Sequence, residues 1–207
     1  MIRVAMTRAG MIAIGAISAG AMADITSIGE FSSLSFEGFD DERWVFETNA
    51  QDIMGGIGQV FADDSGWIHT TNSWTLSGQY NTNAYDGSML GNTRGGISYT
   101  FGTSQYAFGG FFATISDTAD GVIRFYSGDT MLGGSTVSAR VGGEWTWSGW
   151  SVADGFDRIE VVSNYNDGAG GFLMHDSVRV SNQTIPAPGA IACFGIVGIA
   201  FSRRRRG

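Results

Sequence analysis

The segment GVIRFYSGD (Gly121–Asp129), which is soon followed by GGSTV (Gly133–Val137), is the clearest guide to the fold of this chain. Its first part is a run of β-branched and aromatic residues, which favour strands. The Ser-Gly-Asp that ends this run is typical of a tight turn, because Gly accepts a positive φ and Asp closes a local hydrogen bond. The segment therefore predicts a strand, a hairpin turn and a second strand.

The same alternation of strand runs and turn signals fills the region from residue 24 to residue 185. This region contains no proline and no sustained 3.6-residue apolar period, which argues against helices. About a dozen strands at this spacing predict an all-β, antiparallel β-sandwich. The predicted strands are Leu34–Phe39, Arg43–Glu47, Gly58–Ala62, Trp67–Thr71, Trp74–Ser77, Gly96–Phe101, Ala107–Ile115, Val122–Ser127, Thr136–Val141, Glu144–Trp147, Arg158–Ser163 and Phe172–Val180.

The first 23 residues have the parts of a secretory signal peptide. Two arginines come first, an apolar run of small residues spans 9–19, and Ala21 and Ala23 stand at the −3 and −1 positions that signal peptidase requires. We therefore expect residues 1–23 to be removed during export. An N-terminal anchor helix is the alternative, although the apolar run is short for a membrane span.

The last residues, 186–207, form a tail with three parts. Pro186, Ala187 and Pro188 come first, and these two prolines, the only ones in the chain, make an extended boundary that breaks helices. The apolar run 189–201 can form a membrane helix, with the basic residues after it on the cytoplasmic side. A buried amphipathic helix is the alternative, but the run has no polar face. The basic residues are Arg203, Arg204, Arg205 and Arg206.

This tail resembles the sorting signal of PEP-CTERM proteins. The resemblance implies recognition by an exosortase in the inner membrane and cleavage near Pro186–Pro188. The family motif has glutamate between its prolines, where this chain has Ala187, so retention of the tail as an anchor is a second possibility. Together the two ends predict a signal peptide (1–23), a β-sandwich ectodomain (24–185), a sorting tail (186–207) and a location at the cell surface.

Charge separates the predicted ectodomain from its two ends. All twelve basic residues are arginine, and six of them lie in the ends, whereas all twenty carboxylates lie in the ectodomain. Six arginines and twenty carboxylates give the ectodomain a net charge near −14. Such a surface repels nucleic acid, so we expect no nucleic-acid partner. The single cysteine, Cys193, lies in the tail, so the ectodomain has no internal disulfide.

A second resemblance concerns the part of the chain from residue 95 to residue 181. The opening hairpin is followed by Gly155–Ser163 and by a closing run, Gly171–Val180, each rich in β-formers. This succession resembles the C-terminal half of secreted jelly-roll modules with a concanavalin-like or galactose-binding-like sandwich. It implies a jelly roll.

Asp176 is the carboxylate with the most unusual predicted surroundings. It alternates with His175 along the closing strand, so the two side chains point to opposite faces. Asp176 shares its face with Met174, Val178 and Val180, which predicts that this face meets the core. A carboxylate in that position needs an arginine, backbone N–H groups or a metal ion as a partner.

Calcium is the metal that the jelly-roll resemblance implies. In such modules an acid on the last strand often shares the ion with an acid near the start of the domain, a part that Glu37, Asp40 or Asp41 could take. Asp176, Glu37 and Asp40 are therefore the candidate ligands of a structural calcium. The alternative is that Asp176 lies near the end of its strand and accepts backbone hydrogen bonds. The oxygen-rich segment 164–168 also resembles a calcium loop faintly, but a hairpin turn accounts for it better.

Aromatic residues are the candidate ligand-binding groups. Trp145, Trp147 and Trp150 lie within six residues, and Tyr85 lies in a polar loop. Exposed aromatic rings beside Asp and Asn stack on sugar rings, which makes Trp147, Trp150 and Tyr85 the candidates. For the three tryptophans we favour the interpretation that Trp145 and Trp147 cover the core of the sandwich, with Trp150 as the exposed member.

These observations favour a structural or adhesive protein that works beside exopolysaccharide. A carbohydrate-binding module is the alternative, and a polysaccharide hydrolase is the second alternative. Hydrolysis needs two carboxylates at a set separation, and only Asp176 is predicted to point inward. The ectodomain also lacks a cysteine and a Gly-x-Ser-x-Gly motif, so we assign no catalytic residue.

Overall fold

The computed structural model describes residues 23–41, 43–63, 66–74, 82–92, 96–114, 121–140, 143–163 and 173–186. The predicted signal peptide up to residue 22 and the predicted tail from Ala187 onward lie outside these residues. So does the calcium-like segment 164–168. Within the described part of the chain, no helix has the length and apolar character needed to cross a membrane.

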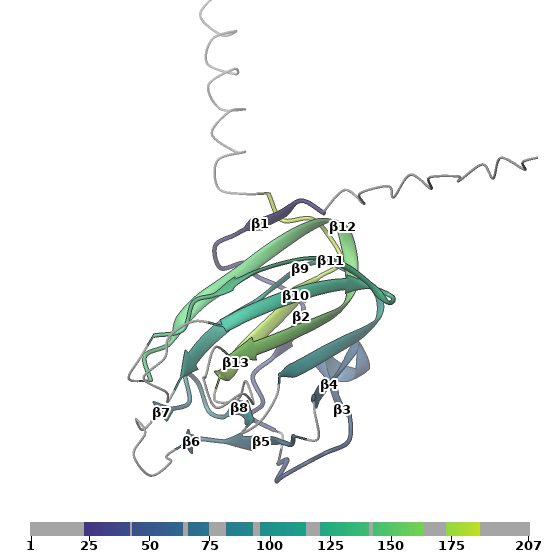
Figure 1. Cartoon of the computed structure of the whole chain (residues 1–207). Coiled ribbons are helices and arrows are strands. Elements are labelled where there is room, and N and C mark those ends of the chain that lie inside the picture. Colours follow the sequence, from purple (N-terminus) through teal and green to yellow (C-terminus); the bar gives the residue numbers. More distant parts are fainter. Residues whose placement is uncertain are drawn as a thin grey trace, which may run out of the picture.

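The predicted all-β class is confirmed for the described residues, whose only helical element is the 3₁₀ turn η1 (Met54–Gly56). Figure 1 shows the strands in their places. The strands are β1 (Ile25–Ser27), β2 (Ser35–Glu37), β3 (Gln51–Ile53), β4 (Gly58–Ala62), β5 (Ile68–Thr71), β6 (Ser73–Trp74), β7 (Thr82–Asn83), β8 (Met89–Asn92), β9 (Ile97–Thr114), β10 (Gly121–Ser127), β11 (Thr130–Val137), β12 (Thr146–Ser163) and β13 (Leu173–Ser181).

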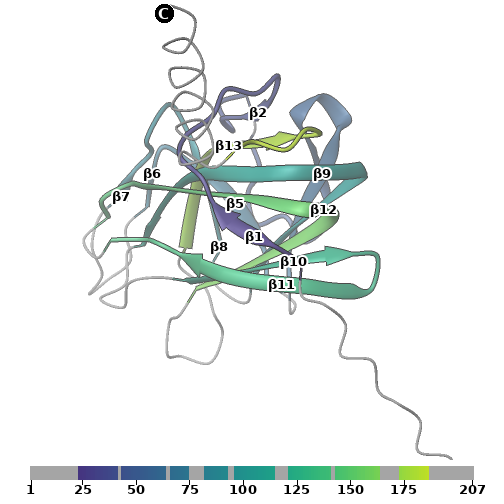
Figure 2. The ribbon, with the colours of Figure 1, turned by 90° about the horizontal axis from the view of Figure 1, so that it is seen from above.

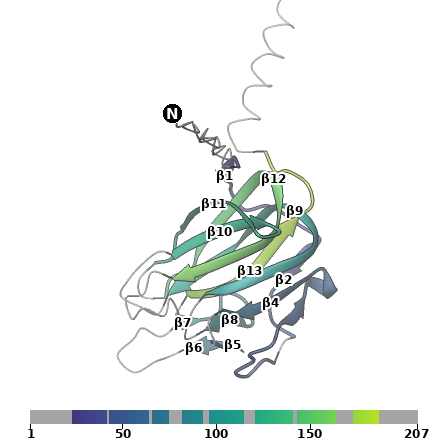
Figure 3. The ribbon, with the colours of Figure 1, turned by 45° about the vertical axis from the view of Figure 1, so that its right-hand side comes forward.

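Eleven of these strands form one antiparallel sheet with a sandwich-like arrangement. Its main path runs β11-β10-β12-β9-β13-β8-β5, while β1, β2 and β4 pair with β12, β13 and β9, respectively, and β3 pairs with β4. The short pair β6-β7 forms a second sheet. In Figures 1 and 3, β1 lies at one end of the molecule and β5 to β8 lie at the other.

The hairpin predicted after Gly121 is confirmed. β10 and β11 pair from Gly121↔Val137 to Ser127↔Thr130, and Gly128 in the turn has a φ of 55°. Both carboxylate oxygens of Asp157, on the neighbouring strand β12, accept a hydrogen bond from the Gly128 N–H at 3.0 Å. β11 begins at Thr130, earlier than the predicted start at Thr136, because the turn is only two residues long.

The two longest strands each replace a pair of predicted strands. β9 joins the predicted strands at 96–101 and 107–115, and β12 joins those at 144–147 and 158–163. Figure 2 shows both strands running across the molecule. Their mutual register is irregular between Ser151 and Arg158, so each strand continues through a bend instead of ending in a turn.

The bends change which residues face the core. On β9, odd-numbered residues such as Tyr99 are buried in the main core before the bend, and even-numbered residues such as Phe108 are buried there after it. On β12, Trp150 and Val152 enter the core from the first half, and Ile159 enters it from the second half. Each of the two long strands therefore contributes alternate residues to the same core on both sides of its bend, and the alternation shifts by one residue at the bend.

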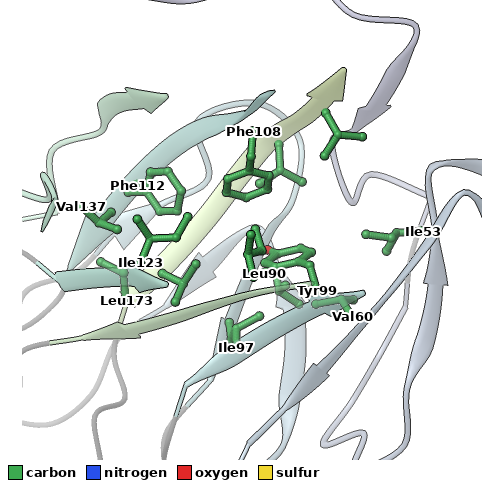
Figure 4. Close-up of a cluster of buried hydrophobic side chains, with 14 of the residues drawn as sticks. Ile53, Val60, Leu90, Ile97, Tyr99, Phe108, Phe112, Ile123, Val137 and Leu173 are labelled. Carbon is green, nitrogen blue, oxygen red and sulfur yellow. The ribbon is translucent and has the colours of Figure 1, made fainter. Parts of the chain in front are cut away.

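The main core lies between the bent strands and their neighbours. Figure 4 shows side chains from both halves of β9 packed with others from β4, β8, β10, β11 and β13. Burial of these apolar side chains is the principal driving force for the fold.

One predicted strand, Arg43–Glu47, is wrong. Only Glu47 is paired there, in an isolated bridge with Ile68, and Phe46 has a φ of 57° that breaks the extended conformation. Trp44 is buried in the core from this irregular segment. Burial does not follow the alternation of a strand either, since Trp44 is buried whereas Val45 and Phe46 are both more than half exposed.

Candidate functional site

Aromatic side chains gather on the outer side of β12, β9 and β13, opposite the main core. The register there forms two cross-strand rows. One row is Trp147–Phe111–Asp176, and the next is Gly149–Gly109–Arg179, which continues to Phe36 on β2. We call this surface the aromatic face; its aromatic members are Phe36, Tyr85, Phe111, Trp145 and Trp147.

Tyr85 is the most exposed ring of this face. It comes from the connection between β7 and β8, and its ring stacks on that of Phe111 with a centroid distance of 3.8 Å and an interplanar angle of 14°. The side chain is 51% exposed. One side of the ring is therefore covered by Phe111, while the other can receive a ligand.

Trp147 lies flat on the sheet because two glycines make room for it. Gly109 and Gly149 are directly paired, and a Cβ on Gly109 would lie 2.6 Å from Cζ2 of the indole. The Trp147 Nε1–H donates a hydrogen bond of 3.2 Å to the carbonyl of Ile28. The ring of Phe111 meets the indole edge-on at 5.4 Å, so Tyr85, Phe111 and Trp147 form one continuous aromatic surface.

Arg179 lies between Trp147 and Phe36. Its guanidinium carbon is 5.4 Å from the centroid of the indole and 5.5 Å from that of Phe36, within the range of cation–π attraction. One nitrogen, Nη1, forms a 2.9 Å salt bridge with Glu30 and donates to the carbonyl of Phe31. The charge of Arg179 is thus matched by Glu30, and Phe36 remains 45% exposed.

Trp145 ties the Tyr85 loop to the sheet. Its Nε1–H donates a 2.8 Å hydrogen bond to the carbonyl of Asn83, and its ring meets Tyr85 at 6.4 Å. Trp145 also packs on the small cluster that contains Trp74 and Met174, which covers this end of the face. The opposite end is covered by a cluster that contains Ile28 and Phe31.

Trp150, predicted as an exposed ligand-binding residue, is instead a core residue with 1% exposure. Its indole stacks with Phe108 at 6.3 Å and meets Phe125 edge-on. The sequence correctly placed Trp145 and Trp147 on one side of the strand and Trp150 on the other. The core, however, lies on the side of Trp150, and not on the side of Trp145 and Trp147. The sequence does not distinguish the two sides of β12, because both carry aromatic residues.

Asp176 is fully buried, but on the outer side of its strand. Before this residue, the core receives Leu173 and His175; after it, the core receives Val178 and Val180. The change of parity occurs at a bulge, where Ser177 has a φ of 51° and the register with β9 shifts. The predicted face was therefore correct only for the part of the strand after Ser177.

The Tyr85 loop covers Asp176. One carboxylate oxygen, Oδ2, accepts hydrogen bonds from the backbone N–H groups of Tyr85 (2.9 Å) and Asp86 (3.2 Å). The Ser177 hydroxyl donates to the other oxygen at 3.1 Å. Burial raises the pKa of Asp176 to about 7, although these hydrogen bonds act in the opposite direction.

The other two candidate calcium ligands also accept backbone N–H groups. The two oxygens of Glu37 accept from Phe39 and Met54, each at 2.9 Å, and Asp40 accepts from Ser88 at 2.8 Å. Within the described residues, no three His, Cys, Asp or Glu side chains are grouped closely enough to hold a metal ion. Calcium at Asp176 stays a prediction, which a melting temperature unaffected by added calcium would contradict.

His175 belongs to the core. Its Nδ1 lies 2.7 Å from the hydroxyl of Tyr99, and its ring packs on Phe112. Burial lowers the pKa of His175 to about 3, so the imidazole is neutral at physiological pH. His175 is therefore a core residue and not a member of the aromatic face.

A second aromatic cluster surrounds β5 and β6. Trp67 and Trp74 stack on each other at 6.1 Å, and the rings of Phe46 and His69 meet Trp67 from its sides. Phe46 is exposed, but its ring is directed edge-on to Trp67 at 4.4 Å. The two indoles of this cluster turn flat faces toward each other.

The structure thus joins two of the three predicted ligand-binding residues, Tyr85 and Trp147, through Phe111. Sequence analysis did not identify Phe111, Phe36 or Arg179 as members of the site. Phe36 lay in a predicted strand, but its position beside Arg179 depends on the pairing of β2 with β13.

Comparison with known proteins gives only distant structural similarity. No protein-family model matches the chain, and no curated protein has a detectably similar sequence. Among solved structures, a variant of the carbohydrate-binding module CBM29-2 in complex with mannohexaose is 14% identical, with a TM-score of 0.37, over 77% of this chain and 92% of that one. Another structure of a family 29 carbohydrate-binding module is 15% identical, with the same TM-score, over 81% and 97% of the two chains.

The enzymatically active domain of tailspike protein 4 from bacteriophage CBA120 is also similar in part. It is 18% identical, with a TM-score of 0.32, over 59% of this chain and 19% of that one. All of these TM-scores are too low to establish a shared fold or function.

Proposed function

We propose that this protein binds carbohydrate through the aromatic face. The observation that carries the proposal is the continuous surface of Tyr85, Phe111 and Trp147, in which Tyr85 stacks at 3.8 Å and is still 51% exposed. The C–H faces of a sugar ring are apolar and match such a surface, while its hydroxyl groups need polar neighbours. Arg179 lies between two of the rings and supplies a polar group.

The rigidity of the face also supports binding. Hydrogen bonds hold the Tyr85 loop at Asp176, at Asp40 and at Trp145, and Trp147 is fixed between a glycine pair and a backbone carbonyl. A surface that is ordered before the ligand arrives loses less conformational entropy on binding.

The proposal is binding without cleavage. Two carboxylates at the face are already engaged, since Asp176 accepts backbone N–H groups and Glu30 pairs with Arg179. A glycosidase of the usual kind needs two free carboxyl groups on either side of the bond. The chain length of a bound polysaccharide should therefore be unchanged after incubation with the protein.

We also propose that the protein acts at the cell surface, as a structural or adhesive partner of exopolysaccharide. Three features of the sequence support this assignment: the predicted signal peptide with its Ala21 and Ala23 motif, the tail that resembles a PEP-CTERM signal, and the acidic composition between them. Mass spectrometry of the protein from its native cells tests the processing. A C-terminus near Pro186 indicates cleavage by an exosortase, and an intact arginine block indicates an anchor.

Replacing Tyr85 with alanine tests the binding site. Loss of a central stacking ring should weaken binding to a neutral polysaccharide by about tenfold or more, as truncation of a hot-spot residue does. The measurement is affinity electrophoresis or titration calorimetry with the full chain. Phe46→Ala, which removes an exposed ring from the second aromatic cluster, is the matched control and should bind like the wild type. Normal affinity in the Tyr85 variant would exclude the aromatic face.

A further inference from the structure

A hollow of about 400 Å³ is lined in part by Leu34 and Ser35, the residues that precede Phe36 of the aromatic face. It is formed where β2, the bend of β9 and the segment after β13 meet. Most of its lining carries hydroxyl or amide groups, and no charged side chain of the described residues lines it. The polar members are Ser32, Ser33, Ser35, Thr103, Gln105, Ser181, Asn182 and Gln183, and the apolar ones are Leu34, Ile57 and Val180.

Internal hydrogen bonds order part of this lining. The amide nitrogen of Gln105, which is almost fully buried, donates to the carbonyl of Thr103 at 3.0 Å. The hydroxyl of Ser181 donates to the carbonyl of Gln183 and accepts from its N–H. The hollow therefore exists without a ligand, and its volume is within the range of small-molecule sites.

Leu34 connects the hollow with the aromatic face. It lines the hollow, its side chain is fully exposed, and it lies two residues before Phe36. The Cα atoms of these two residues are at most about 7 Å apart. Leu34 and Phe36 are therefore two exposed apolar side chains within this distance, and one ligand can contact both.

The charges of the region favour a neutral ligand. Arg179, the cation of the aromatic face, is paired with Glu30 at 2.9 Å, and the hollow is lined by uncharged groups. The ectodomain as a whole carries a net charge near −14, from its six arginines and twenty carboxylates. A polyanionic chain would be repelled on approach, whereas a neutral polyhydroxylated chain would not.

We propose that the hollow and the aromatic face are parts of one extended site that takes several sugar units of a neutral polysaccharide chain. This inference rests on the proposed function. From Trp147 on β12 to Phe36 on β2 there are three strand spacings, which amount to about 14 Å. The hollow, which Leu34 lines two residues before Phe36, adds to this length, so a single sugar covers only a part of the site.

The test compares neutral oligosaccharides of increasing length, such as gluco- and manno-oligosaccharides, by calorimetry with the full chain. Affinity of the wild type should rise with length until the hollow is reached. Leu34→Ser should lower the affinity for the longest chains several-fold and leave that for the shortest unchanged. Tyr85→Ala should weaken all of them. Met131→Ser, at a half-exposed position on β11, is the matched control and should have no effect.

The outcomes separate the two proposals. If Leu34→Ser binds every length like the wild type while Tyr85→Ala does not, the extended site is wrong and the aromatic face stands. If Tyr85→Ala also binds normally, the proposed function itself fails. Tighter binding of a polyuronate than of neutral chains would overturn the assignment of a neutral ligand.

Discussion

At Asp176, burial and hydrogen bonding act in opposite directions on one carboxyl group. Burial dominates and raises its pKa to about 7, so the folded protein binds a proton there more tightly than the unfolded chain does. The stabilisation that this proton brings is complete below the ordinary pKa of an aspartate, about pH 4, and is lost as the pH rises to about 7.

The free energy of unfolding should therefore decrease by a few kcal/mol between about pH 4 and pH 7 because of Asp176 alone, since one pKa unit corresponds to about 1.4 kcal/mol. Asp176→Asn keeps an oxygen for the N–H groups of Tyr85 and Asp86 but cannot ionise, and should lose this part of the pH dependence. Urea unfolding across this pH range, in a buffer with chelator, measures it. Asp157→Asn, which alters another backbone-binding carboxylate, is the control; identical profiles for wild type and Asp176→Asn would refute the prediction.

Glu37 stabilises two backbone turns at once. Phe39 and Met54, whose N–H groups it accepts, have φ angles of 61° and 54°, which are unfavourable for residues other than glycine. Glu37→Ala leaves both donors without this acceptor and should cost about 2 kcal/mol or more of stability. Glu37→Gln keeps one acceptor oxygen and should cost less. Equal urea midpoints for the alanine variant and the wild type would contradict this role.

Individual residues show where prediction from the sequence succeeds and where it stops. Tyr85 and Trp147 are predicted as ligand contacts because aromatic rings with Asp and Asn nearby are the usual means of stacking on sugar rings. Trp150 and Asp176 were assigned to the wrong sides because alternation tells which residues share a side, but not which side meets the core. At Asp176 the alternation itself changes, since the positive φ of Ser177 depends on tertiary pairing.

Among the elements, the bent strands are what create the aromatic face. After the bend of β9, Phe108 and Phe112 point into the core, and this leaves Gly109 and Phe111 on the outer side. The sequence predicted most of these strand segments but divided β9 and β12 in two. The bends are rich in residues that also form turns, so the sequence alone does not show that each strand continues through its bend. The cross-strand register shows it.

The glycine pair under Trp147 is an element-level test of the face. Gly109→Ala would place a Cβ 2.6 Å from the rigid indole and 3.1 Å from the Cα of Gly149, so Trp147 must move. We expect a loss of about 1–3 kcal/mol in stability, as in other overpacked sites, and a changed near-ultraviolet circular dichroism signal. Gly102→Ala, on the same strand but with open space at its Cβ, should change neither; an unaltered signal in Gly109→Ala would argue against this packing.

In the whole molecule, the two ends of the described chain meet at the same end. Ile185 packs in the cluster of Ile28 and Phe31, close to β1, whereas the Tyr85 loop lies toward β5 to β8 at the other end (Figure 3). If the proposed tail anchors the protein, its Tyr85 end points away from the membrane. The domain limits are predicted from the signal-peptide and tail motifs, whereas this arrangement depends on the pairing of β1 with β12 and on the contacts of Ile185.

The six tryptophans offer the most direct test of carbohydrate binding at the aromatic face, because each gives one indole N–H signal in a nitrogen-15 NMR spectrum. Trp145 and Trp147 lie on the face, Trp44 and Trp150 in the core, and Trp67 and Trp74 in the second aromatic cluster. During titration with a neutral oligosaccharide, we predict that the signals of Trp147 and Trp145 shift and that the other four stay in place. Shifts confined to Trp67 and Trp74, or no shift in any signal at saturating ligand, would contradict the account.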